Sequence, residues 1–125
     1  MKILKLSVQQ KQLSTAEADL WVFVHLDATD ATAQIRGCLT GPRCGNVETV
    51  EINYPIKPQP RPPEYAEDVL VGRIVIPDPN FWIPEMPFVY EGNVELWFEG
   101  KCAHIRPIRA AFKATGSIDL VSRDA

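Results

Sequence analysis

Apolar residues recur at every second position between residues 88 and 98, and this alternation constrains the fold more than any other feature of the chain. Successive side chains of a strand point to opposite faces, so the segment predicts a β-strand with one buried face and one mostly wet face. Such strands are typical of antiparallel sheets. One parity holds Phe88, Tyr90, Gly92, Val94, Leu96 and Phe98, and the other holds Val89, Glu91, Asn93, Glu95 and Trp97.

The same alternation predicts further strands, each with its apolar parity toward the core. They lie at residues 4–8, 20–26, 33–40, 49–54, 70–76 and 103–112, and a short strand at 118–120 closes the set. Pro107 interrupts one of them, which predicts an edge position or a bulge. About seven strands separated by turn-forming residues predict a single all-β domain over residues 1–125. We expect an immunoglobulin-like antiparallel β-sandwich, with a small barrel as the alternative.

Proline accounts for 11 of the 125 residues, nearly twice the usual share of about 5%, and this disfavours long helices. We expect helical structure only at residues 13–20, where Ser14 and Glu17 have the spacing of a capping box. Residues 55–63 hold five of the prolines. This stretch predicts a stiff connection between strands, and the alternative is a polyproline helix that docks in an SH3-type groove.

Charge and the chain ends indicate the expected surroundings. Lys and Arg number 13 against 16 Asp and Glu, a net charge of −3, so nucleic acid and anionic membranes are not expected partners. The first residues lack the apolar core of a secretory signal, and no apolar run approaches the roughly 18 residues of a membrane-spanning helix. We therefore expect a soluble, cytoplasmic protein.

The cysteines predict neither a disulfide framework nor a metal centre. Cys38, Cys44 and Cys102 are an odd number, which favours reduced thiols in a protein without an export signal. Together with His104 they form Cys-x5-Cys and Cys-x-His pairs, and these spacings depart from those of structural zinc sites. We expect no metal and no cofactor.

Residues 82–90 carry a W-x-P-x-x-P-x-x-Y pattern, formed by Trp82, Pro84, Pro87 and Tyr90. It resembles a segment of the immunoglobulin-like domain of glycoside hydrolase family 2, the β-galactosidase and β-mannosidase group. The resemblance covers residues 33–112, because residues 35–42, 47–52 and 104–109 are similar to other segments of that domain in order and separation. In the multidomain relatives this sandwich spaces and orients its neighbours.

The resemblance implies a domain without catalysis, since the family's catalytic glutamates lie in a barrel that this chain does not contain. Hydrolysis of a glycoside requires two carboxylates across a cleft. Glu85, Glu91, Glu95 and Glu99 are the nearest candidates, and three of them alternate with core residues along one strand. Outward charges of that kind usually solvate a sheet face, so we expect no catalytic residue.

Four aromatic residues are the candidate binding residues: Trp21, Tyr65, Trp82 and Trp97. The alternation places Trp97 and Trp21 on the faces of their strands that point away from the core. Outward aromatics are covered by another part of the chain, buried against a protein, or used to stack sugar rings. We expect a non-catalytic structural or interaction module that binds a second copy or another protein. The alternative is a carbohydrate-binding module.

Overall fold

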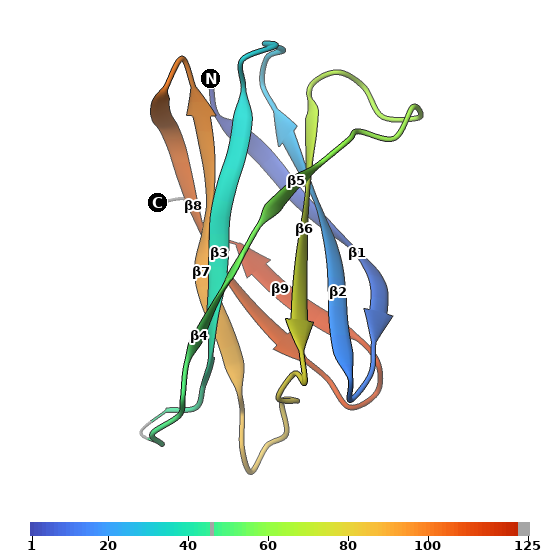
Figure 1. Cartoon of the computed structure of the whole chain (residues 1–125), viewed down its shortest axis with the longest axis vertical. Helices are drawn as coiled ribbons and strands as arrows, with labels where there is room; N and C mark the ends of the chain where they lie inside the picture. Colours follow the sequence, from blue (N-terminus) through green and yellow to red (C-terminus); the bar gives the residue numbers. More distant parts are fainter. Residues whose placement is uncertain (46, 123–125) are drawn as a thin grey trace.

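The computed structural model describes residues 1–45 and 47–122, and its strands form two antiparallel sheets packed face to face (Figure 1). The first sheet has the order β1-β2-β6-β5, and the second has the order β4-β3-β7-β8-β9. The strands are β1 (Ile3–Leu13), β2 (Glu17–Leu26), β3 (Gln34–Arg43), β4 (Ile52–Pro55), β5 (Lys57–Gln59), β6 (Val69–Pro77), β7 (Val89–Phe98), β8 (Lys101–Phe112) and β9 (Ile118–Ser122).

The strand order is that of an immunoglobulin-like sandwich, which confirms the predicted fold class. Strands A, B, E and D of such a domain form one sheet, and C, F and G form the other, with an added C′ strand in variable-type domains. Here β1, β2, β6 and β5 occupy the first four places, and β4, β3, β7 and β8 follow as C′, C, F and G. The described chain has nine strands rather than about seven, since β5 forms within the proline-rich stretch and β9 adds an edge beside β8.

The proline-rich stretch carries the chain from one sheet to the other, as expected for a stiff connection. Between β4 and β5, the N–H of Ile56 donates to the Gly37 carbonyl at 2.8 Å, and the Ile56 side chain is buried in the core. Pro58 lies in β5, an edge strand, where a missing donor is tolerated. Pro107 lies in β8 just before Ile108, the last residue that β9 pairs within the described residues. Pro58 therefore stands where its strand has a neighbour on one side only, and for Pro107 no pairing with β9 falls among the described residues.

The prediction of a helical turn at residues 13–20 is wrong, because β1 and β2 meet there in a hairpin. The Ser14 N–H donates to the Glu17 carbonyl at 2.9 Å, and the Ser14 hydroxyl oxygen accepts from the Glu17 N–H at 3.3 Å. The second bond is the one that Ser makes at a helix N-terminus, so the capping pattern serves a tight turn here. Pairing along the whole of β1 and β2 outweighs the local helical preference.

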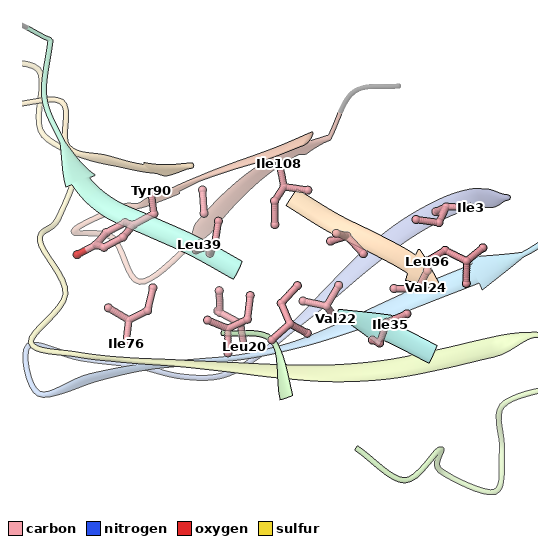
Figure 2. Close-up of a cluster of buried hydrophobic side chains, with 14 of the residues drawn as sticks. Ile3, Leu20, Val22, Val24, Ile35, Leu39, Ile76, Tyr90, Leu96 and Ile108 are labelled. Carbon is pink, nitrogen blue, oxygen red and sulfur yellow. The ribbon is translucent and has the colours of Figure 1, made fainter. Parts of the chain in front are cut away.

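One hydrophobic cluster, drawn from both sheets, fills the space between them (Figure 2). Leu20, Val22, Val94 and Leu96 are buried as the alternation in β2 and β7 predicts. Phe88 and Phe98, predicted on the same buried face, are only half-buried and lie outside the core cluster. Residues from Ile3 in the first strand to Phe112 in the eighth belong to this cluster. The side chains at the alternate positions of these strands point outward and form the surfaces on which a partner can bind.

Tyr90 closes one end of this core and ties a loop to it. Its ring is 1% exposed and packs 5.2 Å from the Phe112 ring, and its hydroxyl accepts the N–H of Asn80 at 2.9 Å. A Tyr at the start of strand F whose hydroxyl bonds to upstream backbone is the tyrosine corner of immunoglobulin-like domains. Burial raises the pKa of Tyr90 above its ordinary value of 10.0. The Tyr of the W-x-P-x-x-P-x-x-Y pattern therefore fixes the loop between β6 and β7.

Candidate functional site

The four aromatic residues predicted as binding residues lie in three separate places. Trp21 and Tyr65 share the outer face of the β1-β2-β6-β5 sheet, where both pack against one small cluster. Trp97 is on the outer face of the other sheet, in β7. Trp82 lies in the loop between β6 and β7. The fold brings together the first two only.

Around Trp21 the chain covers its own aromatic face. Phe23, next to Trp21 on the same face of β2, is only 3% exposed because the Tyr65 ring stacks on it at 4.7 Å between centroids. Tyr65 belongs to the loop between β5 and β6, which folds over this face. Beside the cluster, Arg73 donates two hydrogen bonds to the Asp19 carboxylate, at 2.7 and 2.8 Å. This pairing raises the pKa of Arg73.

Trp97 is also engaged by its neighbours. The Arg36 guanidinium lies 4.2 Å from the centroid of the Trp97 ring, and the indole Nε1–H donates to Glu95 at 2.8 Å. A carboxylate oxygen of Glu91, which lies on the same strand and face as Glu95, is 3.8 Å from a guanidinium nitrogen of Arg43. The outward carboxylates of β7 therefore interact with side chains of their own sheet.

Trp82 lies on the outer side of the second sheet, and its neighbour Phe81 is the residue that packs against the core. The backbone N–H of Trp82 donates to the Phe112 carbonyl at 2.8 Å, which holds the loop against the end of β8. Trp82 lines a trough of about 400 Å³ together with Arg109 and Asp119. This trough runs over β8 and β9, so a ligand bound in it can contact Trp82.

A cation lies over each of the three tryptophan rings. The Lys11 ammonium nitrogen lies 5.0 Å from the centroid of the Trp21 ring, and the Lys113 ammonium nitrogen lies 3.4 Å from the centroid of the Trp82 ring. With Arg36 at Trp97, all three are within the roughly 6 Å of a cation–π contact. A sugar that stacks on one of these faces has to displace a positively charged side chain.

A hollow lies at the end of the sandwich where the β3–β4 and β6–β7 loops meet, the lower end in Figure 1. Its volume is about 510 Å³. We call it the end hollow. It is lined by Pro42, Val47, Glu48, Thr49, Val50, Ile52, Tyr54, Pro77, Asp78, Asn80, Phe88 and Tyr90.

Three aliphatic side chains of the end hollow face solvent to an unusual degree. Val50 is 86% exposed, Ile52 is 52% exposed and Val47 is 49% exposed. The alternation at residues 49–54 predicts a core-facing parity for Val50 and Ile52, and this prediction is wrong. Val50 precedes β4, and the pairing of β4 with β3 ends at Ile52, so this part of the chain overhangs the end of the core.

Local contacts hold the two walls of the end hollow in place. On one wall the Thr49 hydroxyl donates to the Pro42 carbonyl, and Arg43 and Glu51 form an ion pair. The other wall is fixed by the bond between Asn80 and the buried Tyr90 described above. The shape of the hollow is therefore set by contacts within the folded chain.

The cysteines and His104 are dispersed. Cys38 is half-buried in β3, Cys44 is buried after β3, and Cys102 is exposed at the start of β8. The His104 Nδ1 accepts the N–H of Ile3 at 2.8 Å, which joins the start of β1 to β8. Within residues 1–45 and 47–122, no three His, Cys, Asp or Glu side chains form a group that could hold a metal ion.

No family model matches the chain, and no curated protein matches it. In the part of the chain that the structure describes, no helix is long and apolar enough to cross a membrane.

Proposed function

We propose that this chain is a non-catalytic structural or interaction module, similar to the immunoglobulin-like domain of family 2 glycosidases, that docks a partner protein through its end hollow. The observation that carries the proposal is the exposure of Val47, Val50 and Ile52 around one hollow. Apolar side chains gathered at one end of a domain favour burial against another protein, at about 25 cal/mol per Å² of apolar surface removed from water.

The comparison between surfaces supports this location. The outer face around Trp21 is covered by the loop that carries Tyr65, and Trp97 is engaged by Arg36 and Glu95. Aromatic side chains that are already packed or paired offer little new area to a partner. At the end hollow the aliphatic side chains stand in solvent, and their area is available for burial on binding.

The environment of the β7 carboxylates supports a role without catalysis. Glu95 accepts a hydrogen bond from Trp97, and Glu91 lies near Arg43 on an open sheet face. A glycosidase needs one carboxyl group in a pocket that raises its pKa and a second across the substrate. Both carboxylates are instead engaged by side chains of their own sheet, and the Arg43 guanidinium that lies near Glu91 is also bonded to Glu51.

The trough beside Trp82 favours a second candidate, a carbohydrate-binding module. It combines an indole with the charged side chains of Arg109 and Asp119, which can bond to sugar hydroxyls. Lys113 over the indole ring opposes it, because that face is occupied. We therefore place this function second.

Amide chemical-shift mapping by NMR separates the two functions. Small apolar probes, isopropanol and phenol, are titrated into one sample, and a panel of oligosaccharides at millimolar concentration into another. We expect the apolar probes to shift the amides of residues 47–52 and 88–90, with no response there in a Val50→Asp/Ile52→Asp variant. Oligosaccharide shifts around Trp82 and Arg109, without a response of the end hollow to apolar probes, would replace the proposal with the carbohydrate-binding function.

A further inference from the structure

We infer that the end hollow takes a polypeptide segment in which an apolar side chain is flanked by lysine or arginine. The inference rests on the proposed function and names the chemistry of the partner. Two features of the hollow lead to it: a floor and wall of apolar side chains, and a rim whose charged residues are all acidic.

The apolar part of the hollow selects for a hydrophobic side chain. Tyr54 and Tyr90 line the hollow where it meets the core, and Val50, Ile52 and Phe88 line it as well. The Tyr54 and Tyr90 rings meet edge to face at 6.2 Å between centroids. A volume of about 510 Å³ accommodates a few side chains rather than a whole element of structure.

The rim selects for positive charge. Glu48 and Asp78 are the charged residues that line the hollow, both are exposed, and neither carboxylate has an ion-pair partner among the described residues. The nearby cation, Arg43, is bonded to Glu51 and lies close to Glu91, so it does not neutralise the rim. A cationic group that approaches the hollow therefore meets a negative potential and two free carboxylates.

The same charges argue against other occupants. In a two-fold symmetric contact the same patch of both copies meets, so two end hollows would bring Glu48 and Asp78 of each copy together. Like charges placed face to face oppose association. The phosphates of nucleic acid and of anionic lipid are repelled by the rim for the same reason. A segment of another polypeptide, apolar and basic, fits both the floor and the rim.

Hydrogen bonds within the folded chain also hold the end hollow in one shape before a peptide segment binds. The Thr49 bond to Pro42 and the Asn80 bond to Tyr90 fix the two loops that form its walls. Little ordering is then needed on binding, which favours measurable affinity for a short segment.

Selection from a random peptide library tests the inference without assuming a partner. Phage that display random peptides of about 12 residues are bound to the full chain and depleted on the Val50→Asp/Ile52→Asp variant. Both substitutions are at exposed positions, and thermal unfolding of the variant verifies that it is folded. We expect the selected peptides to share an apolar residue flanked by lysine or arginine.

Charge reversal then tests the rim with a synthetic peptide of the selected sequence. We expect Glu48→Lys/Asp78→Lys to weaken binding at least tenfold and to bind better the same peptide with glutamate at its flanking positions. The matched control is Glu64→Lys/Glu67→Lys, the same change of charge on the exposed β5–β6 loop, at the other end of the sandwich in Figure 1. This control should leave the affinity unchanged.

The possible outcomes separate the inference from the proposed function. Selected peptides that are apolar without a basic bias, or that carry acidic flanks, overturn the inference and leave docking at the end hollow standing. Failure to select any peptide that prefers the unmodified chain over Val50→Asp/Ile52→Asp overturns both. An equal loss of binding in the two charge-reversed variants refutes the role of Glu48 and Asp78.

Discussion

Replacing Tyr90 with Phe removes one hydroxyl group and the bond that ties the β6–β7 loop to the core. The ring stays in place, since it is 1% exposed and packs on Phe112, so the change isolates the hydrogen bond from Asn80. Such a bond contributes about 1 kcal/mol net to stability. An unfolding entropy of about 2.1 cal/mol/K per residue gives roughly 0.26 kcal/mol/K for 125 residues. The melting temperature should therefore fall by about 4 °C.

Tyr54→Phe is the matched control. Tyr54 is half-buried beside Tyr90, and its hydroxyl makes no hydrogen bond within residues 1–45 and 47–122. We expect its melting temperature to match the unmodified chain. Amide hydrogen exchange gives a second reading, because the Asn80 N–H should exchange faster in Tyr90→Phe and at an unchanged rate in Tyr54→Phe.

Alkaline pH should reduce the difference between Tyr90→Phe and the unmodified chain. Burial raises the folded-state pKa of Tyr90 above 10.0, so above about pH 10 the unfolded chain loses a proton that the folded chain keeps. The contribution of Tyr90 to stability is complete below the unfolded pKa and declines as pH rises toward the folded pKa. Equal melting temperatures for Tyr90→Phe and Tyr54→Phe at neutral pH, with unchanged exchange at Asn80, would refute the role of the hydroxyl.

Three further substitutions test individual contacts that support the sheets. Arg73→Met leaves the buried Asp19 carboxylate without its partner. We therefore expect this single variant to have a lower melting temperature than the double variant Asp19→Asn/Arg73→Met, and a higher one would contradict the argument. Gly92→Ala places a methyl group 1.8 Å from the Cys38 carbonyl oxygen. Urea unfolding should therefore show a free energy of unfolding lower by about 1–3 kcal/mol, and an unchanged value would show that β3 can shift to accommodate the methyl group without cost. A backbone N–H donated to Asp27 lowers the pKa of that carboxyl from 3.8. Its contribution is present above that pH and is lost in acid, so melting of Asp27→Asn should depend less on pH below about 3.8, whereas identical acid curves would contradict the assignment.

The sequence predicts the sandwich well because its signal is local. A period of two depends only on neighbouring residues along one strand, so the inward set of β7, including Val94 and Leu96, is recognisable without any other strand. The turn residues between the runs are equally local. A local pattern fails to predict structure where it fits two structures equally well. At Ser14 the hydroxyl makes the same hydrogen bond in a hairpin as it would at the start of a helix.

The candidate site is predicted less well, because its residues are remote from one another in the sequence. Alternation places Trp21 and Trp97 on outward faces, and the structure agrees. It gives no sign that Tyr65 folds over Phe23, or that a cation stands on each indole ring. These contacts come from loops and neighbouring strands whose positions depend on the assembled sheets.

By itself the sequence determined the strand periodicity, the turns, the sandwich class and the residue types available for binding. Only the tertiary structure decided that Val50 overhangs the core, and that Val50 meets Asp78 and Phe88 at one end of the sandwich. The physical reason is that burial and electrostatic potential are properties of the whole assembly. Whether an alternating valine is core or surface depends on whether the opposite sheet extends far enough to cover it, and at Val50 it does not.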